Sequence, residues 1–156
     1  MDNQISILMG VYYRNSNISL LKRSVLSILD QSVKNIELVL CDDGSSLEAR
    51  TFLDDLSRVD CRLILVRRGN LYSLPEKLDE CLRVSRGKLI ARMDDDDFSH
   101  SDRLEKQAKY LEAHPEIAFV GCNAALYRNG TQVGIRRLPP YPLVRDFYFT
   151  QPYLLP

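Results

Sequence analysis

Neither basic nor acidic residues are in excess in this sequence, which contains 21 of each among its 156 residues. Because the formal net charge is zero, the chain has no overall basic field of the kind that attracts nucleic acid, and we expect no nucleic-acid partner. No uninterrupted apolar run approaches the roughly 20 residues that a membrane-spanning helix requires. The N-terminal stretch MDNQISILMG lacks the basic region that precedes the apolar core of a secretory signal. These absences predict a cytoplasmic protein.

The sequence also lacks cysteine pairs of the Cys-x-x-Cys type, which bind zinc or exchange disulfides. Its four cysteines are Cys41, Cys61, Cys81 and Cys122. Cys41 lies within an apolar, strand-like run, where a small buried thiol is the ordinary interpretation. We therefore predict reduced cysteines with a structural role, in preference to zinc ligands or disulfides.

Glycine-rich phosphate loops are absent as well, since neither G-x-x-x-x-G-K-[ST] nor G-x-G-x-x-G occurs. Phosphates would therefore have to be held by other groups.

The apolar fraction of 45% and the charged fraction of 27% are those of a globular protein. A chain of 156 residues is long enough for one domain with its own core, but too short for two ordinary domains.

Stretches of β-prone and of amphipathic character alternate along most of the chain. We predict five strands, over residues 5–13, 36–41, 62–66, 88–93 and 117–122. We predict four helices, over residues 18–31, 46–58, 75–84 and 101–114. This alternation indicates an α/β fold, a three-layer α/β/α sandwich with a mostly parallel sheet and helices on both faces. Asn129-Gly130, between two β-prone arms, then predicts a β-hairpin with a type I′ turn.

Short sequence patterns predict where the second helix begins and which residues share one side of the third helix. Ser45 and Glu48 have the spacing of a capping box, which predicts that the second helix begins just after Ser45. Leu74, Leu78 and Leu82 recur at helical spacing, so we expect them to lie along one side of the third helix.

Acidic residues directly follow two of the predicted strands. Asp42-Asp43-Gly44 comes after the second strand, and the run from Asp94 to Asp97 comes after the fourth. Ligands of open α/β sheets bind at the carboxyl ends of the strands, so both groups fall where a site is expected. Two simpler interpretations stay open, a turn with a helix cap at the first group and a solvated acidic loop at the second.

Four consecutive carboxylates raise one another's pKa values unless a cation neutralises them. Mg²⁺ and Mn²⁺ take oxygen ligands and, in nucleotide sites, share their coordination shell between carboxylates and phosphate oxygens. In an extended segment alternate side chains point to the same side, so we expect Asp94 and Asp96 to face one site. The residues alone therefore predict a Mg²⁺- or Mn²⁺-dependent site for a phosphate-bearing ligand in an α/β domain.

The chain resembles the inverting family 2 glycosyltransferases of GT-A fold in three segments: ISILMGVYYR, SVLSILDQSVKNIELVLCDDGSS and RGKLIARMDDDDFSHSDRLEKQ. The resemblance runs from about residue 5 to residue 122, with the spacing between the motifs preserved. It implies a metal-dependent enzyme that transfers a sugar from a nucleoside-diphosphate sugar, with a UDP-sugar expected. The implied acceptor is a saccharide or a lipid-linked molecule in bacterial cell-surface polysaccharide synthesis, with peripheral membrane association of the full-length enzyme.

The resemblance also implies roles for individual residues. Those implied to contact the nucleotide sugar are Val11, Tyr12, Asp43, Asp94 and Asp95. Of these, Asp43 and Tyr12 would line the pocket of the base, whereas Asp94 and Asp95 would lie near the ribose and phosphates. Asp96, together with Asp94, would bind the Mn²⁺ or Mg²⁺ that bridges the diphosphate and stabilises charge on the departing nucleotide.

Three further residues near the acidic run have roles outside this set. Asp97 is expected to support the loop. Arg92 either reaches substrate or, as a surface arginine, balances the four aspartates. Arg103, which opens the fourth helix, is expected to be structural.

The chain departs from the family pattern at several positions that we expect to flank the nucleotide pocket. Tyr13, the segment SSLEAR (45–50) and the segment LDEC (78–81) replace the usual residues, so the base and sugar preferences stay open. The family's general base is an Asp or Glu in the acceptor half, and no acidic residue after the run matches that motif. We therefore expect a nucleotide-sugar-binding domain over residues 1–138, with the start of a truncated acceptor-side region over 139–156 and no assigned catalytic residue.

Two other function classes remain to be weighed. A non-catalytic remnant could bind a nucleotide sugar or serve a regulatory role without transferring the sugar. A response-regulator-like receiver domain also combines an α/β fold with clustered aspartates and Mg²⁺. That class places paired acids after its first strand, where this chain has VYYR, and we therefore do not favour it.

Overall fold

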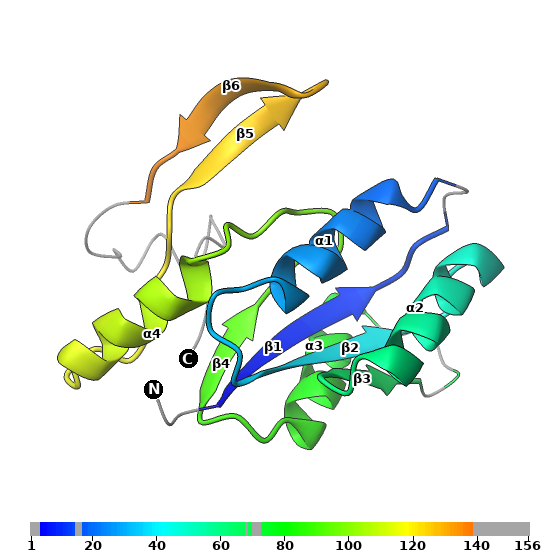
Figure 1. The fold of residues 1–156 in the computed structure, drawn as a ribbon, viewed down its shortest axis with the longest axis horizontal. Helices are drawn as coiled ribbons and strands as arrows, with labels where there is room; N and C mark the ends of the chain where they lie inside the picture. Colours follow the sequence, from blue (N-terminus) through cyan, green and yellow to red (C-terminus); the bar gives the residue numbers. More distant parts are fainter. Residues whose placement is uncertain (1–3, 15–16, 68, 70–72, 139–156) are drawn as a thin grey trace. The chain divides into compact units, whose positions relative to one another are not determined.

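A computed structural model describes residues 4–14, 17–67, 69 and 73–138 (Figure 1). The chain divides into two compact units, residues 1–108 and residues 109–156. We describe each unit by itself. The predicted boundary after residue 138 stays a prediction, and the segment 139–156 lies outside the described residues.

The first unit is built on a four-stranded, fully parallel sheet (Figure 1). Its strands are β1 (Ile5–Val11), β2 (Ile36–Asp42), β3 (Leu63–Val66) and β4 (Leu89–Arg92). Their spatial order is β3-β2-β1-β4, so β1 and β2 are the central strands. Every residue of β2 is buried, as expected for a strand covered on both faces. The α/β fold with a parallel sheet, predicted from the alternation of elements, is confirmed.

Helices cover both faces of this sheet. They are α1 (Ser19–Leu29), α2 (Leu47–Val59), α3 (Leu74–Val84) and α4 (Arg103–Ala113). Alternate residues of β1 face opposite sides. Ile7 and Met9 belong to the core formed with α1, α2 and the first half of α4, whereas Leu8 packs with Cys81 of α3 on the other face. The three layers expected for the sandwich are therefore present.

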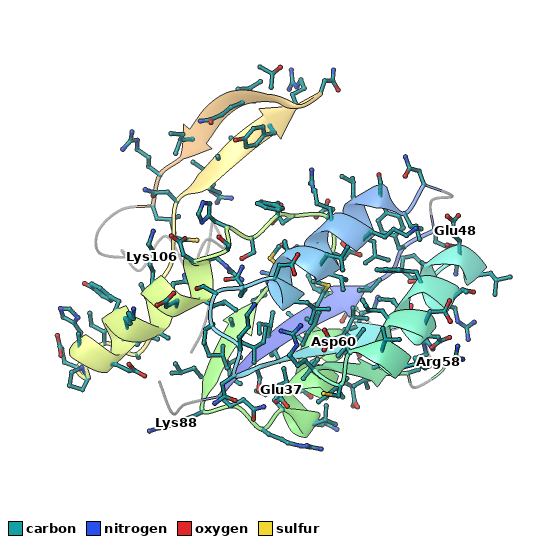
Figure 2. All side chains as sticks on the ribbon, viewed as in Figure 1. Glu37, Glu48, Arg58, Asp60, Lys88 and Lys106 are labelled. Atoms are coloured by element: carbon teal, nitrogen blue, oxygen red, sulfur yellow. The ribbon has the colours of Figure 1, made fainter. Side chains whose placement is uncertain are left out.

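A buried glutamate fixes the connection between α3 and β4. Glu37, in β2, is 3% exposed (Figure 2). Its Oε1 accepts hydrogen bonds from Ser6 Oγ and from the backbone N–H of Arg86, each at 2.6 Å. The N–H of Gly87 donates to Ser6 Oγ at 2.7 Å, and a Cβ at Gly87 would lie 2.5 Å from that oxygen. A glycine is therefore required where the chain enters β4.

The structure corrects one prediction about α2 and shows which side of α3 is buried. The side chain that caps α2 is Ser46, whose Oγ accepts from the N–H of Ala49, because the hydroxyl of Ser45 is already engaged by the N–H of Tyr13. Leu74, Leu78 and Leu82 share one side of α3 as predicted, but Leu74 and Leu82 are 40% and 49% exposed, so this side is not the buried one.

The buried residues of α3 are instead Lys77 and Cys81. Cys81 packs with Leu8 of β1, and Leu78 is only partly buried beside them. The helix is therefore rotated so that a lysine faces the sheet.

The second unit contains an antiparallel hairpin of β5 (Ala124–Arg128) and β6 (Thr131–Arg136). Its turn residues Asn129 and Gly130 have φ values of 49° and 79°. Positive φ at both central positions is the signature of a type I′ turn, and the predicted hairpin is confirmed. The strand predicted over 117–122 is wrong, because none of the described strands pairs with this segment. A short apolar run by itself does not distinguish a strand from other local structure.

All four cysteines are free thiols, with Cys41 and Cys81 buried and Cys61 and Cys122 exposed. Among the described residues, no helix combines the length and apolar character needed to cross a membrane.

Candidate functional site

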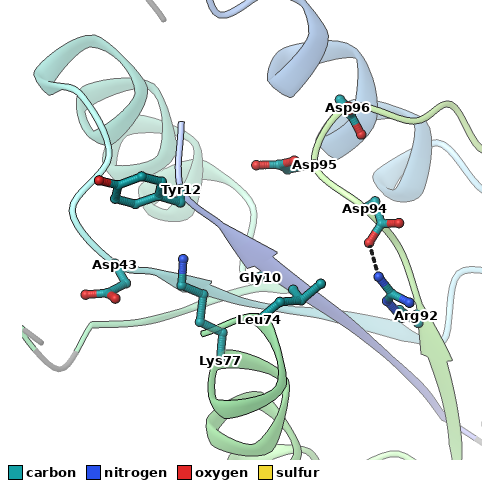
Figure 3. A pocket seen from close by; sticks show the side chains of 9 residues that line it. All are labelled: Gly10, Tyr12, Asp43, Leu74, Lys77, Arg92, Asp94, Asp95 and Asp96. Carbon is teal, nitrogen blue, oxygen red and sulfur yellow. Dashed lines mark hydrogen bonds and ion pairs between the residues drawn. The ribbon is translucent and has the colours of Figure 1, made fainter. Parts of the chain in front are cut away.

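A pocket of about 510 Å³ lies at the carboxyl ends of β1, β2 and β4 (Figure 3). Its lining residues are Gly10, Tyr12, Asp43, Leu74, Lys77, Arg92, Asp94, Asp95 and Asp96. The volume lies within the range of roughly 300–1,000 Å³ that is usual for small-molecule sites. Parallel strands bring their carboxyl ends to one edge of the sheet, and this explains how residues so far apart in the chain meet here.

Most of the residues singled out in the sequence line this pocket. Tyr12 follows β1, Asp43 follows β2, and Asp94, Asp95 and Asp96 follow β4. Val11 differs, since its side chain is fully buried in the core and is not among the lining residues. Its backbone carbonyl oxygen instead accepts hydrogen bonds from Lys77 Nζ at 2.9 Å and from the N–H of Asp43 at 3.3 Å.

Asp42 and Asp43 are neighbours with different surroundings. The buried carboxylate of Asp42 accepts from the N–H of Ser45 at 3.2 Å and from Arg67 Nε at 2.9 Å. Arg67 also pairs with Asp54 of α2, so Asp42 joins the turn after β2 to the end of β3 and to α2. The turn interpretation of this motif therefore holds for Asp42, whereas Asp43 faces the pocket.

The acidic run is not extended as expected. β4 ends at Arg92, and Asp95 and Asp96 form a turn. Burial raises the pKa of the Asp95 carboxyl above its ordinary value, and the adjacent Asp96 carboxylate raises it further. The pKa of Asp97, which does not line the pocket, is raised by the same two causes. A cation bound among these groups would relieve the repulsion.

Arg92 lies beside this turn and lines the pocket. Its Nη2 forms an ion pair with Asp94 Oδ1 at 2.7 Å. Of the two roles considered for Arg92, balancing the aspartates is thus observed directly for Asp94. Its place in the pocket also leaves it within reach of a ligand.

The carboxylates that line the pocket suit a divalent ion that shares its coordination shell with a ligand. Among residues 4–14, 17–67, 69 and 73–138, no group of three His, Cys, Asp or Glu side chains is arranged to hold a metal ion alone. Mg²⁺ is typically bound by one or two carboxylates together with phosphate oxygens and water, and does not need a closed protein cage. Asp94 and Asp96, which line one pocket, offer that number of carboxylates.

Lys77 is a pocket residue that the sequence interpretation did not identify. It is 5% exposed, and its Nζ lies 5.0 Å from the centroid of the Tyr12 ring (Figure 3). Gly10 makes room for it, because a Cβ there would lie 3.2 Å from Lys77 Cβ and 2.7 Å from Leu74 Cδ1. The spacing of Lys77 and Cys81, four residues apart on one helix face, was the signal available in the sequence.

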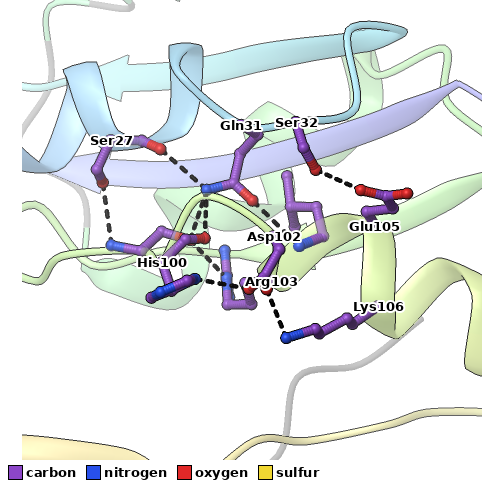
Figure 4. A network of polar contacts seen from close by, with 10 residues as sticks. Ser27, Gln31, Ser32, His100, Asp102, Arg103, Glu105 and Lys106 are labelled. Atoms are coloured by element: carbon purple, nitrogen blue, oxygen red, sulfur yellow. Dashed lines mark hydrogen bonds and ion pairs between the residues drawn. The ribbon is translucent and has the colours of Figure 1, made fainter.

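Side chains of α1 form hydrogen bonds to the acidic run. They also bond to the segment after it (Figure 4). Gln31, which is fully buried just after α1, donates to Ser99 Oγ at 3.1 Å and to the carbonyl oxygen of His100 at 2.8 Å. Its Oε1 accepts from the N–H of Leu104 at 3.1 Å. Arg103 Nε donates to Ser99 Oγ at 2.8 Å, which agrees with the structural role expected for Arg103.

The departures from the family pattern do not line the pocket itself. Tyr13 is 7% exposed, and its hydroxyl donates to the carbonyl oxygen of Asn17 at 3.1 Å. Neither Tyr13 nor the segments 45–50 and 78–81 line the pocket, whereas Leu74 and Lys77 do. Residues that could tune ligand preference are therefore found one turn earlier on α3 than the sequence suggested.

Comparison with known families agrees with this geometry. Residues 6–153 match the family described as Glycosyl transferase family 2. The chain belongs to this family. It is 35% identical over 140 residues to a Bacillus subtilis (strain 168) protein named "Putative glycosyltransferase EpsE", covering 89% of the chain and 49% of that protein.

A second relative has a more specific name. The chain is 24% identical over 136 residues to the Escherichia coli protein WfaP, named a UDP-Glc:alpha-D-GlcNAc-diphosphoundecaprenol beta-1,3-glucosyltransferase. That match covers 87% of the chain and 52% of WfaP. The chain thus spans about half the length of both relatives.

Solved structures show the same fold. The mannosyltransferase PcManGT of Pyrobaculum calidifontis, in complex with GDP-Man and Mn²⁺, superposes with a TM-score of 0.67 at 20% identity, covering 77% of this chain and 35% of that one. S. aureus TarS, in complex with UDP-GlcNAc, gives a TM-score of 0.61 at 17% identity, covering 72% and 32%. The predicted GT-A fold is therefore confirmed.

Proposed function

We propose that this chain binds the donor of a glycosyl transfer, a nucleoside-diphosphate sugar, in the pocket at the carboxyl ends of β1, β2 and β4. The observation that carries the proposal is the meeting of Tyr12 and Asp43 with Asp94, Asp95 and Asp96 in one pocket. These residues come from three strand ends and combine an aromatic surface with four carboxylates.

The pocket has two chemically different ends in this proposal. Tyr12, Asp43 and Lys77 take the nucleoside, with an aromatic ring, a hydrogen-bond acceptor and a hydrogen-bond donor. Asp94 and Asp95 lie near the ribose and phosphates, and Asp94 and Asp96 hold Mn²⁺ or Mg²⁺. When bound, the ion supplies Lewis-acid stabilisation of the charge on the departing diphosphate. Val11 contributes through its backbone, which positions Lys77 and Asp43.

We further propose a UDP-sugar as the donor and a saccharide or lipid-linked acceptor in bacterial cell-surface polysaccharide synthesis. The names of the Escherichia coli relatives, which specify UDP-Glc and a diphosphoundecaprenol acceptor, support this choice. The GDP-Man complex of PcManGT makes GDP the first alternative nucleotide to test. We expect the base that activates the acceptor hydroxyl in the acceptor half of the full-length enzyme, and we expect peripheral membrane association of that enzyme.

Calorimetric titration of the 156-residue chain with UDP and Mn²⁺ tests donor binding. We expect binding by the unchanged chain, and at least tenfold weaker binding by Asp96→Ala, because the variant lacks a metal ligand. Asp79→Ala is the matched control, since Asp79 is an exposed acid paired with Arg83 on α3. Equal binding by Asp96→Ala would remove the metal role of Asp96, and absence of UDP and GDP binding by the unchanged chain would contradict the donor site.

A further inference from the structure

The acidic turn poses a physical problem that its own residues do not solve. Asp94, Asp95, Asp96 and Asp97 are consecutive carboxylates, and like charges at such short range repel one another. A turn of this composition needs external contacts to keep its carboxylates converging on one pocket.

Two consecutive residues of α1 supply such contacts. Ser24 Oγ donates to the backbone carbonyl oxygen of Asp94 at 2.7 Å, although the two residues are 70 positions apart. Arg23 Nη2 donates to the carbonyl oxygen of Asp96 at 3.0 Å. The two bonds hold alternate residues of the turn, one on each side of Asp95.

The same helix continues to hold the chain beyond the turn. Ser27 Oγ accepts from the N–H of Ser99 at 3.0 Å, and Gln31 donates to Ser99 and His100 (Figure 4). Ser24 and Ser27 lie three residues apart on the buried side of α1, and the buried Gln31 follows just after the end of this helix. Buried polar groups are retained where they have partners, and here their partners lie in the segment that includes the acidic turn.

These contacts determine which oxygens remain for a ligand. The carbonyl oxygens of Asp94 and Asp96 already accept bonds from α1, whereas the carboxylates of Asp94, Asp95 and Asp96 line the pocket (Figure 3). We therefore expect the carboxylates, and not these carbonyl oxygens, to coordinate the metal. Arg23 also places a positive charge beside the turn.

We propose that Arg23 and Ser24 are positioning residues for the divalent cation and the diphosphate. They hold the turn from Asp94 to Asp96 in its binding geometry before the ligand arrives, so binding does not have to order three repelling residues. This inference rests on the proposed donor site and assigns a function to two residues of α1 that do not line the pocket.

Arg23 offers the sharper test because its side chain is exposed and its removal leaves no cavity. We expect Arg23→Ala to weaken Mn²⁺–UDP binding about 5- to 30-fold, while the melting temperature stays within about 2 °C of the unchanged chain. Free Mn²⁺ is measured by electron paramagnetic resonance at fixed UDP. Arg58→Ala, an exposed arginine of α2, is the matched control and should leave the affinity unchanged.

Arg23→Gln separates the hydrogen bond from the charge, because glutamine keeps a donor but is neutral. Arg23→Ala is expected to raise the logarithm of the Kd for Mn²⁺–UDP. If Arg23→Gln recovers at least half of that change, the result supports positioning through the carbonyl oxygen of Asp96. Binding as weak as that of Arg23→Ala would show that only the charge matters and would overturn the positioning role.

Ser24→Ala provides the second variant. Ser57→Ala is its control, since Ser57 Oγ makes a similar bond to the carbonyl oxygen of Asp54 at 2.9 Å. We expect Ser24→Ala to lower the affinity of the folded protein for Mn²⁺–UDP, and Ser57→Ala to leave it unchanged. Unchanged affinity in both Arg23→Ala and Ser24→Ala overturns the inference, whereas absence of binding by the unchanged chain overturns the donor site itself.

Discussion

The ammonium nitrogen of Lys77 lies 2.9 Å from the carbonyl oxygen of Val11, inside a pocket whose lining includes four aspartates. Lysine is rarely buried without a partner, yet Lys77 is only 5% exposed. One of its three N–H groups bonds to Val11, and the amine points toward the space between Tyr12 and Asp43 (Figure 3). The position of this cation suits a contact with the ligand better than a purely structural role.

Lys77→Met tests this interpretation. Methionine keeps most of the side-chain length and removes the charge, so we expect UDP to bind about tenfold more weakly in the presence of Mn²⁺. The free energy of unfolding should change by no more than about 1 kcal/mol, because the cost of burying a cation disappears together with its hydrogen bond. Calorimetry and urea denaturation measure the two quantities. Lys88→Met, at an exposed lysine, is the control, and unchanged affinity in Lys77→Met would assign Lys77 to the fold alone.

Replacing Gln31, unlike replacing Lys77, should have a large effect on the free energy of unfolding because of the contacts that its side chain makes. Gln31→Leu leaves the buried N–H of Leu104 without its partner and removes one of the hydrogen bonds to the carbonyl oxygen of His100. We expect the free energy of unfolding to fall by about 2–4 kcal/mol, because unsatisfied buried groups keep their full desolvation cost. Urea denaturation followed by circular dichroism checks this value. Gln132→Leu, at an exposed position of β6, should change it by less than about 0.5 kcal/mol.

The sheet and the acidic site could be predicted because both depend on local sequence patterns. Buried parallel strands are continuous apolar runs, and the four runs of the first unit became β1 to β4. The rule that ligands bind at strand ends then selected Asp43 and the run from Asp94, which the structure brings into one pocket. The resemblance added Tyr12, which also lines it.

The remaining features depend on contacts between distant segments, which a local pattern does not contain. The rotation of α3 that buries Lys77 depends on the missing side chain at Gly10, 67 positions earlier. The bond from Ser24 to Asp94 depends on how α1 packs beside β4. The run turns at Asp95 and Asp96 where an extended segment was expected, and periodicity in the run itself gives no sign of the bonds that α1 makes to this turn.

Asp60 and Arg62 predict a specific pH dependence of stability. Arg62 donates to both carboxylate oxygens of Asp60, at 3.0 and 2.7 Å, and this hydrogen bonding lowers the pKa of Asp60 below its ordinary value (Figure 2). Because the folded-state pKa is depressed, the stabilisation is complete above the unfolded pKa of about 4 and is lost as the pH falls through the lower folded value.

The variant Asp60→Asn isolates this contribution. At pH 7 we expect its free energy of unfolding to be lower than that of the unchanged chain by about 1 kcal/mol, a small value because the pair is partly exposed. The difference should shrink steadily below pH 4. Urea denaturation at a series of pH values measures it, with Asp55→Asn as the control at an exposed acid. A difference that stays constant from pH 7 to pH 2 would show that titration of Asp60 does not contribute.

The four free thiols should react in two classes. Burial and, to a smaller extent, the neighbouring Cys41 raise the pKa of Cys81 to about 12, and burial also raises the pKa of Cys41. Since the thiolate is the reactive form, both should be nearly inert at pH 8, whereas the exposed Cys61 and Cys122 react readily. Ellman's reagent should detect two thiols in the native protein and four in urea. In the double variant Cys61→Ser, Cys122→Ser, the two remaining thiols should react at the rate of unfolding, and fast native labelling of this variant would contradict the burial of β2 and α3 that places them in the core.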